Sequence, residues 1–562
     1  MLITDEQLKD LLVKNNIVDE KNFQILHDYA KNSGSNLIDS LLGRNVISDE
    51  KLGTLIADYL HYPFIDLSKI TIPEDVFHII PEKVARKQGI IPFEKDTENI
   101  KLAMADPTNI DVAQMLTKKT GLKITPYLTT ERAIENTLKI YRKGIASTFE
   151  ELLKESMNEG GLLKRDEEAP IAKIVDQLVE FAYQDKASDI HIEPQEKNSL
   201  VRFRIDGVLH DMITVPKDFH ERIISRIKIL SRLRTDEHLS PQDGKMRVSL
   251  EDEDLDIRVS ILPVADGEKA VLRLLASKTR KFSLADLGMN GQDLAKVIVA
   301  YNKSYGMILS TGPTGSGKTT SIYAILKILN TREKNITTIE DPVEYRIKGV
   351  NQIQVNQKAD LTFANGLRSI LRQDPNIVFV GEIRDDETAG IAVNAALTGH
   401  LVLSTLHTND SATALPRLID MGVEPFLVAS TVNIIIAQRL VRRICDVCKI
   451  PRKIKRNDLT INIPQEVIAK HFPAGEEITT FHGNGCKSCY QTGYTGRIGI
   501  FEVLEVSKEI KKLITDKRDS DVIVRQAISE GMSTMLDDGL NKVANGTTSI
   551  EEVLRATKVE KL

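Results

Sequence analysis

Apolar residues recur at helical spacing in the first quarter of the chain. The runs Leu8–Leu12 and Leu52–Tyr59 repeat leucine and isoleucine at the spacing of one helix face. The segments 11–20 and 41–50 resemble each other, and each predicts a helix, a turn and a second helix. Residues 1–143 therefore predict a small α+β domain.

A polar and acidic stretch follows this domain. Residues 144–169 include Gly160-Gly161 and a charged run at 165–168, a composition typical of a linker. Whether it is a hinge or a plain solvated connection stays open.

The next apolar pattern is a helix followed by strands. Pro170 suits the first turn of a helix predicted over Ile171–Gln184. Apolar and polar residues then alternate in Leu200–Ile205, and again at 256–260 and 271–274, which predicts half-buried strands. We interpret residues 170–280 as a separate middle domain.

From Asn302 onward, short apolar runs alternate with helical patterns. This order is typical of an α/β domain with a largely parallel sheet. We assign residues 281–562 to this domain and expect the chain as a whole to be an α/β protein.

Composition narrows the class of protein. The 562 residues are 41% hydrophobic and carry a formal charge of −5, which gives no reason to expect a nucleic-acid partner. No run of about 18 apolar residues predicts a membrane span. The acidic start, Met1 to Asp10, is unlike a secretory signal. We therefore expect a cytoplasmic protein.

A glycine-rich segment matches the phosphate-binding P-loop pattern. It lies between an apolar strand, 307–310, and a helical run, 321–329. Its glycines let backbone N–H groups point at phosphate oxygens, and the helix N-terminus adds partial positive charge. Lys318 is expected to reach the β- and γ-phosphates of ATP, and the Thr319 hydroxyl to ligate Mg²⁺. The predicted nucleotide-binding residues are Gly312, Pro313, Thr314, Gly315, Ser316, Gly317, Lys318, Thr319 and Thr320.

Three apolar strands of the same domain end in residues able to serve nucleotide hydrolysis. The strand 376–381 precedes Glu382, the strand 336–339 precedes Glu340, and the strand 401–406 precedes His407. Hydrolysis needs groups that hold the metal and orient water. Each strand-end acid alone could be a helix cap, but three such ends beside a P-loop favour a catalytic site.

This ordered set of motifs resembles the ATPase family of type IV pilus assembly and type II secretion. The segments that carry the resemblance are Gly312–Thr319, Glu340–Glu344, Gly381-Glu382, Leu367–Pro375, and Thr398–His400 with Val402–Asn409. The resemblance covers almost the whole chain. It implies a RecA-like motor domain, a PAS-like middle domain and a zinc-binding subdomain at about 440–500. It also implies that Glu382 orients water, Glu340 helps hold Mg²⁺ or water, and His407 senses the γ-phosphate.

The family forms homohexameric rings in which arginines from the preceding domain reach the phosphates. Arg202, Arg204 and Arg226 are the candidates here, with Arg204 and Arg226 as our assignments. Arg202 and Arg204 lie two positions apart, hence on one side of a strand. A simply exposed strand face is the alternative.

The four cysteines form two close pairs, Cys445-x-x-Cys448 and Cys486-x-x-Cys489. Paired knuckles of this kind predict a tetrahedral structural Zn²⁺ site. The 37 residues between the pairs require an inserted subdomain that closes the site. A redox pair is the alternative.

The N-terminal domain resembles the region that precedes the motor in pilus assembly ATPases. Some relatives bind cyclic di-GMP there through a repeated Arg-Leu-Gly-x-x-Leu motif. The matching positions here, Gln7–Leu12 and Asn36–Leu41, lack both the arginine and the glycine. We therefore favour a domain that docks on the inner-membrane platform protein over a cyclic di-GMP site.

The resemblance implies a motor for pilus assembly. Type II secretion and DNA uptake remain alternatives, as does a nucleotide-binding structural or signalling subunit that hydrolyses little.

Overall fold

The computed structural model describes most of the chain. The described residues are 3–15, 17–20, 23–24, 27, 37–38, 41, 47, 49–70, 72–140, 169–250, 254–275, 283–460, 463–472 and 474–557. The chain forms two compact units. The first contains Met1–Arg142, Phe282–Thr331 and Asn376–Leu562, and the second contains Lys143–Lys281 and Arg332–Pro375. The predicted linker lies outside the described residues, except for Ala169, which begins a helix.

The N-terminal part combines helices with a three-stranded sheet in the order β1-β2-β3. Thr4 caps the first helix, because it accepts from the Gln7 N–H while the Gln7 side chain accepts from the Thr4 N–H. The predicted helices at Leu8–Leu12 and Leu52–Tyr59 are confirmed, whereas much of the predicted repeat lies outside the described residues. The elements are α1 (Asp5–Lys14), α4 (Asp49–Leu60), η1 (Leu67–Lys69), α5 (Glu74–Phe77), α6 (Glu82–Gln88), β1 (Ile90–Lys95), β2 (Asn99–Met104), α7 (Ile110–Thr120), β3 (Lys123–Leu128) and α8 (Glu131–Ile140).

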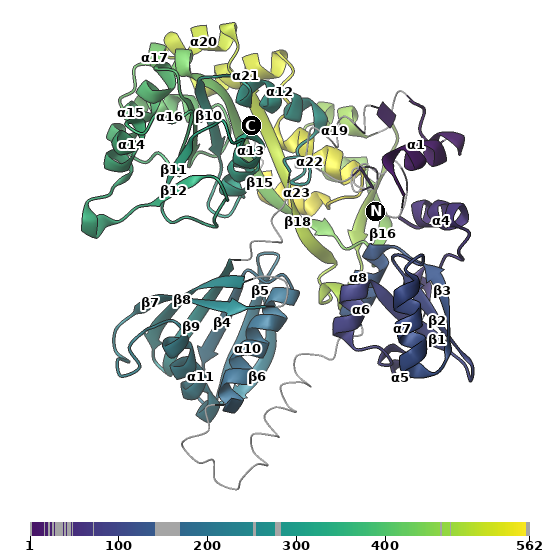
Figure 1. Cartoon of the computed structure of the whole chain (residues 1–562). Coiled ribbons are helices and arrows are strands. Elements are labelled where there is room, and N and C mark those ends of the chain that lie inside the picture. Colours follow the sequence, from purple (N-terminus) through teal and green to yellow (C-terminus); the bar gives the residue numbers. More distant parts are fainter. Residues whose placement is uncertain are drawn as a thin grey trace. The chain divides into compact units, whose positions relative to one another are not determined.

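A six-stranded antiparallel sheet with two helices forms most of the second unit. Its strand order is β6-β5-β4-β9-β8-β7, and α10 and α11 lie against one face (Figure 1). The burial of β5 alternates along its whole length, which confirms the predicted half-buried strand. The elements are α10 (Ala169–Gln184), β4 (Asp189–Pro194), β5 (Asn198–Ile205), β6 (Val208–Pro216), α11 (Lys217–Leu230), β7 (Gln242–Ser249), β8 (Asp254–Val264) and β9 (Gly267–Leu275).

A seven-stranded sheet has the order β12-β11-β13-β14-β10-β15-β18. The pairs β10–β14, β10–β15, β13–β14 and β11–β12 are parallel, and β15–β18 is antiparallel. The predicted largely parallel sheet is thus confirmed. The elements are α12 (Gly291–Tyr301), β10 (Gly306–Thr311), α13 (Lys318–Leu329), β11 (Ile336–Glu340), β12 (Asn351–Gln354), η3 (Gln357–Ala359), α14 (Phe363–Leu371), β13 (Ile377–Val380), α15 (Asp386–Leu397), β14 (Leu401–Leu406), α16 (Ala414–Asp420), α17 (Pro425–Thr431), β15 (Val432–Ile444) and β18 (Tyr494–Glu505).

A two-stranded sheet is inserted between β15 and β18, and four helices follow β18 within the described residues. β16 and β17 pair antiparallel, with Lys449 opposite Gly483. The elements are β16 (Lys449–Lys455), α18 (Arg456–Leu459), α19 (Gln465–His471), β17 (Glu477–Gly483), η4 (Lys487–Cys489), α20 (Lys508–Thr515), α21 (Ser520–Ser529), α22 (Met535–Ala544) and α23 (Ile550–Thr557).

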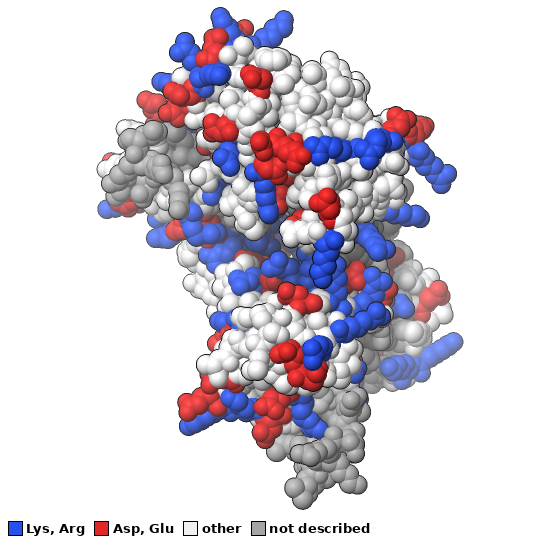
Figure 2. All heavy atoms as spheres, turned by 90° about the vertical axis from the view of Figure 1, so that its left-hand side faces the viewer, with Lys and Arg blue, Asp and Glu red and all other residues white. Residues whose placement is uncertain are grey.

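The molecular surface carries both signs of charge. Figure 2 shows acidic and basic side chains mixed over much of the face drawn. Within the described residues, no helix is both long and apolar enough to cross a membrane.

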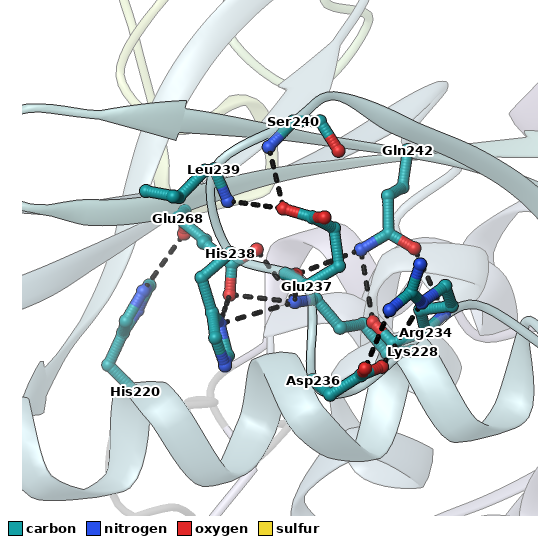
Figure 3. A network of polar contacts seen from close by, with 10 residues as sticks. All are labelled: His220, Lys228, Arg234, Asp236, Glu237, His238, Leu239, Ser240, Gln242 and Glu268. Atoms are coloured by element: carbon teal, nitrogen blue, oxygen red, sulfur yellow. Dashed lines mark hydrogen bonds and ion pairs between the residues drawn. The ribbon is translucent and has the colours of Figure 1, made fainter.

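A buried lysine anchors α11 to the strands of the second unit (Figure 3). The Lys228 side chain is fully buried, and its Nζ lies 2.7 Å from Glu268 Oε1 on β9. The same Nζ donates to the Glu237 carbonyl at 2.7 Å, and His238 Nδ1 lies 2.8 Å from Glu268 Oε2. Because a buried charge must be paired, these contacts fix the end of α11 and the loop that leads to β7.

We expect Lys228→Met to destabilise the second unit by about 3–5 kcal/mol, because it leaves the Glu268 carboxylate buried without its cation. Hydrogen exchange of the β8 and β9 amides measures this loss in the full chain. The double variant Lys228→Met, Glu268→Met should recover most of it, and Lys245→Met, at an exposed lysine of β7, serves as the control. Unchanged exchange in Lys228→Met would show that the pair contributes nothing.

Candidate active site

Three neighbouring strands of the seven-stranded sheet end at one edge. β10 is parallel to β14, and β14 is parallel to β13, so Thr311, Val380 and Leu406 end their strands on the same side. The Ile383 N–H donates to the Thr405 carbonyl at 3.0 Å, and Thr405 Oγ1 donates to the Gly381 carbonyl at 2.7 Å. These bonds hold the segment after β13 against β14, which places Glu382 beside His407.

The P-loop lies between β10 and α13 as the sequence predicts. Gly312, Gly315 and Gly317 have φ values of 145°, 79° and 90°, a region that glycine adopts without strain. Gly317 is the N-cap of α13, which starts at Lys318. The loop therefore leads directly into a helix N-terminus, the arrangement that binds phosphate.

Lys318 lies inside this loop. Its Nζ donates to the Gly312 carbonyl at 2.7 Å and to the Pro313 carbonyl at 3.2 Å. Burial lowers the pKa of Lys318, and the charge of Glu382 raises it in part. The two side chains are thus near enough to interact electrostatically, as a shared phosphate site requires.

Glu382 is buried and contacts two basic side chains. Its Oε2 lies 3.2 Å from His407 Nε2, and its Oε1 pairs with the Arg384 guanidinium. Of these three side chains only Glu382 is shielded from solvent. The His407 and Arg384 side chains are 47% and 64% exposed. A carboxylate with solvent-exposed partners is suited to exchanging them for water when substrate binds.

Hydrogen bonds on both sides fix the loop that follows His407. The Thr408 N–H donates to Thr311 Oγ1 at 3.0 Å, at the residue just before the P-loop. Glu502 on β18 accepts from the Ser411 N–H at 3.0 Å and from Ser411 Oγ at 2.5 Å. Burial raises the pKa of Glu502, while the Ser411 bonds oppose this rise. The histidine is therefore carried by a loop tied to the P-loop strand and to β18.

Glu340 ends β11 and belongs to the second unit. It is buried, and its Oε1 accepts from Thr338 Oγ1 at 2.6 Å and from Gln352 Nε2 at 3.2 Å. Glu340 begins the acidic segment Glu340–Glu344. In this segment the Val343 carbonyl accepts a hydrogen bond from Arg258 on β8 at 2.8 Å. The middle sheet thus contacts the acidic segment within this unit.

The candidate arginines lie on β5 and α11. Arg202 and Arg204 share one face of β5, as predicted, and the opposite face packs into the core with the helices. Arg202 pairs with Glu193 at 2.6 Å. Arg204 lies 3.5 Å from Asp189 and donates to the Gly207 carbonyl at 3.2 Å. Arg226 on α11 has a buried Nε without a hydrogen-bond partner among the described residues.

Sequence reasoning missed three arginines, two on the six-stranded sheet of the second unit and one that follows β13 in the first unit. Arg273 on β9 contacts Asp189 at 2.9 Å, so it shares one carboxylate with Arg204. Arg258 lies opposite Arg273 in the β8–β9 pair. The alternation of apolar and polar residues at 256–260 and 271–274 could have placed Arg258 and Arg273 on one face of the sheet. Arg384 follows β13, where no strand period applies, and its contact with Glu382 has no sequence signal.

The four cysteines come together as the two-knuckle pattern predicts. Cys445 follows β15, and Cys486 and Cys489 lie between β17 and β18. The sulfurs all lie within 4.8 Å of one another. The Cys445–Cys486 distance is 3.8 Å and the Cys448–Cys489 distance is 3.9 Å. A tetrahedral site with Zn–S bonds of about 2.3 Å requires sulfurs about 3.8 Å apart, so the donor set fits zinc.

The inserted subdomain explains how distant pairs meet. The antiparallel pairing of β16 and β17 brings the ends of the insertion together. The N–H groups of Cys486 and Gly493 also donate to Cys489 Sγ, at 3.2 and 3.3 Å. These bonds stabilise a thiolate at that position.

A P-loop at the edge of a mostly parallel sheet, with a carboxylate and a histidine at neighbouring strand ends, defines a P-loop nucleotide-binding protein. A family model described as "Type II/IV secretion system protein" matches residues 164–555. The chain therefore belongs to this family, and it is an ATPase of the family. A model of the MshEN domain matches residues 60–146.

Two relatives extend this similarity. The type IV pilus assembly ATPase PilB of Myxococcus xanthus is 37% identical over 566 residues, which span 98% of this chain and 99% of that protein. The type II secretion system protein E of Pseudomonas aeruginosa is 45% identical over 399 residues, 71% of this chain and 78% of that protein.

A solved structure shares the fold. The X-ray structure of the Legionella pneumophila ATPase DotB superposes with a TM-score of 0.51 at 21% identity, covering 68% of this chain and 94% of that one. This likeness concerns the fold alone.

We expect Cys445→Ser and Cys489→Ser each to lose one zinc per chain and to destabilise the 440–500 region, because structural zinc contributes folding free energy. Elemental analysis of purified protein measures the metal, and limited proteolysis measures the region. Val447→Ala, at an exposed residue of the same knuckle, should keep its zinc. Wild-type protein without metal would contradict the assignment.

Proposed function

We propose that this chain is an ATP-hydrolysing motor that drives assembly of a type IV pilus. The observation that carries the proposal is the grouping of Lys318, Glu382 and His407 at one sheet edge. The similarity to the pilus assembly ATPase of M. xanthus extends over nearly the full length of both chains. That extent favours pilus assembly over type II secretion, since the secretion proteins of P. aeruginosa and Pectobacterium carotovorum align over 71% and 86% of this chain.

The candidate residues take distinct roles in the proposal. The P-loop N–H groups and Lys318 bind the phosphates of ATP, and the Thr319 hydroxyl and Glu340 hold Mg²⁺ or its water. Glu382 orients the attacking water, and His407 responds to the γ-phosphate through its bond to Glu382. Mg²⁺ supplies charge neutralisation on the phosphates. Leaving the Arg384 pair frees the Glu382 carboxylate to accept a hydrogen bond from that water.

The remaining assignments belong to the same proposal. Residues 281–562 form a RecA-like motor domain, 170–280 a PAS-like middle domain, and 144–169 a flexible linker. Six copies form a ring on the cytoplasmic side of the inner membrane. Residues 1–143 dock on the membrane platform protein, with cyclic di-GMP as the alternative ligand that the MshEN match at 60–146 keeps open.

We expect Glu382→Gln to keep ATP binding and to slow turnover by about 10²-fold or more, because the amide cannot accept a proton or orient water as the carboxylate does. Phosphate release measures turnover, and equilibrium binding of a fluorescent nucleotide measures affinity. Glu509→Gln, at an exposed acid in the first turn of α20, should behave like wild type. Loss of nucleotide binding in Glu382→Gln would instead assign this residue a structural role.

We expect Arg204→Ala to keep nucleotide affinity and ring assembly while turnover falls by about 10³-fold, because an arginine delivered on closure stabilises transition-state charge. Arg247→Ala, at an exposed arginine of the same sheet paired with Asp256, serves as the control. Wild-type turnover in Arg204→Ala would show that this arginine is only part of an exposed strand face.

Mixing Arg204→Ala with Glu382→Gln subunits tests whether the arginine acts across a subunit boundary. If it does, some mixed interfaces carry both intact groups, and partial activity returns. If activity stays at the level of the separate variants, the contact lies within one chain.

A further inference from the structure

One buried polar residue interrupts an apolar strand beside the P-loop. β15 runs parallel to β10, and Thr311 pairs with Ala437. Gln438 is therefore the next residue along β15, level with the first glycine of the loop. It is only 2% exposed. An amide in the middle of a sheet needs hydrogen-bond partners, and the nearest groups belong to the P-loop.

Gln438 touches both ends of the loop. Its Nε2 donates to the Ser316 carbonyl at 2.9 Å, and this bond is buried. A Cβ at Gly312 would come within 2.5 Å of the backbone carbonyl oxygen of Gln438. A Cβ at Gly317 would come within 3.1 Å of the side-chain Nε2 of Gln438. The two glycines thus fit against this one residue.

The Ser316 carbonyl matters because of its place in the loop. For the N–H groups around Gly317 and Lys318 to face a phosphate, the carbonyl that precedes them must point the other way. A buried carbonyl turned away from the ligand requires a donor of its own. The Gln438 amide is that donor.

This bond differs from the contacts of Lys318. Lys318 Nζ donates to the carbonyls of Gly312 and Pro313, and it must leave them to reach a phosphate. The Gln438–Ser316 bond makes no use of Lys318. It can therefore persist while the lysine moves, and it keeps the second half of the loop in place.

We propose that Gln438 is a positioning residue of the phosphate site. Its side-chain amide orients the Ser316 carbonyl and so pre-arranges the N–H groups that receive the phosphates of a nucleoside di- or triphosphate. The inference rests on the proposed nucleotide binding. It adds a residue on β15 to a site that the P-loop, β13 and β14 otherwise form.

Two substitutions at this position separate positioning from packing. Gln438→Met keeps the length of the side chain and removes the donor. Gln438→Glu keeps the shape, but its carboxylate cannot donate and adds negative charge beside the phosphates. Protonation of the Glu variant restores one O–H donor at low pH.

The probe is Mg²⁺ with a fluorescent ADP derivative, titrated into the full chain. We expect Gln438→Met to weaken binding roughly tenfold, the size of one buried hydrogen bond. Gln438→Glu should bind more weakly still at pH 8, and its deficit relative to wild type should shrink toward pH 5. Relief of charge repulsion alone would bring Gln438→Glu at pH 5 only to the level of Gln438→Met, whereas a restored donor should bring it above that level. Gln526→Met, the same change on α21, should bind like wild type.

Each outcome decides the matter. Wild-type affinity in Gln438→Met overturns the inference while the proposed function stands, provided that wild type binds and Lys318→Ala does not. If wild type itself binds no nucleotide, the proposed function fails, and the inference fails with it. If Gln438→Met does not fold, Gln438→Leu provides the neutral reference without a donor: tighter binding by Gln438→Glu at pH 5 than by Gln438→Leu supports positioning, and equal binding overturns it.

Discussion

The site depends on the parallel pairing of β10 with β14 on one side and β15 on the other. Parallel strands end at the same edge, so this pairing sets the P-loop, the His407 loop and Gln438 side by side. Thr311, the last residue of β10, extends the link, because it bonds the backbone of Thr408. A slip in either pairing would separate the groups that we propose to bind and sense phosphate.

The buried charged groups at this edge have different kinds of partner. Lys318 and Glu382 are both buried, and each is partnered within the protein, the lysine by carbonyls and the carboxylate by His407 and Arg384. Burial makes an unpaired charge costly, so the partners that each group gives up must be replaced by substrate, metal or water. An exchange of partners is a physical basis for linking nucleotide binding to movement of the exposed Arg384 and His407 side chains.

Much of this arrangement follows from the sequence, and what does not has a physical reason. Local spacing along the sequence is enough to locate the P-loop, the strand-end residues Glu382 and His407, and the two cysteine pairs. The Ser411–Glu502 bond depends on which strands become neighbours, and a single sequence carries no such register. Arg384 lies two residues after Glu382 in a segment without a strand or helix period, so no pattern marked its contact. The spacing of the cysteines requires a subdomain that brings the two pairs together, but it does not reveal the structure of that subdomain. The structure shows that the antiparallel β16–β17 pair does this.

The central claim is that this sheet edge hydrolyses ATP. The most direct measurement is steady-state phosphate release by the purified chain with Mg²⁺ and ATP, with wild type compared to Lys318→Ala. Wild type should turn over ATP and Lys318→Ala should not, because the variant lacks the charge proposed to hold the β- and γ-phosphates. Turnover near the wild-type level in Lys318→Ala, or none in wild-type rings, would contradict it.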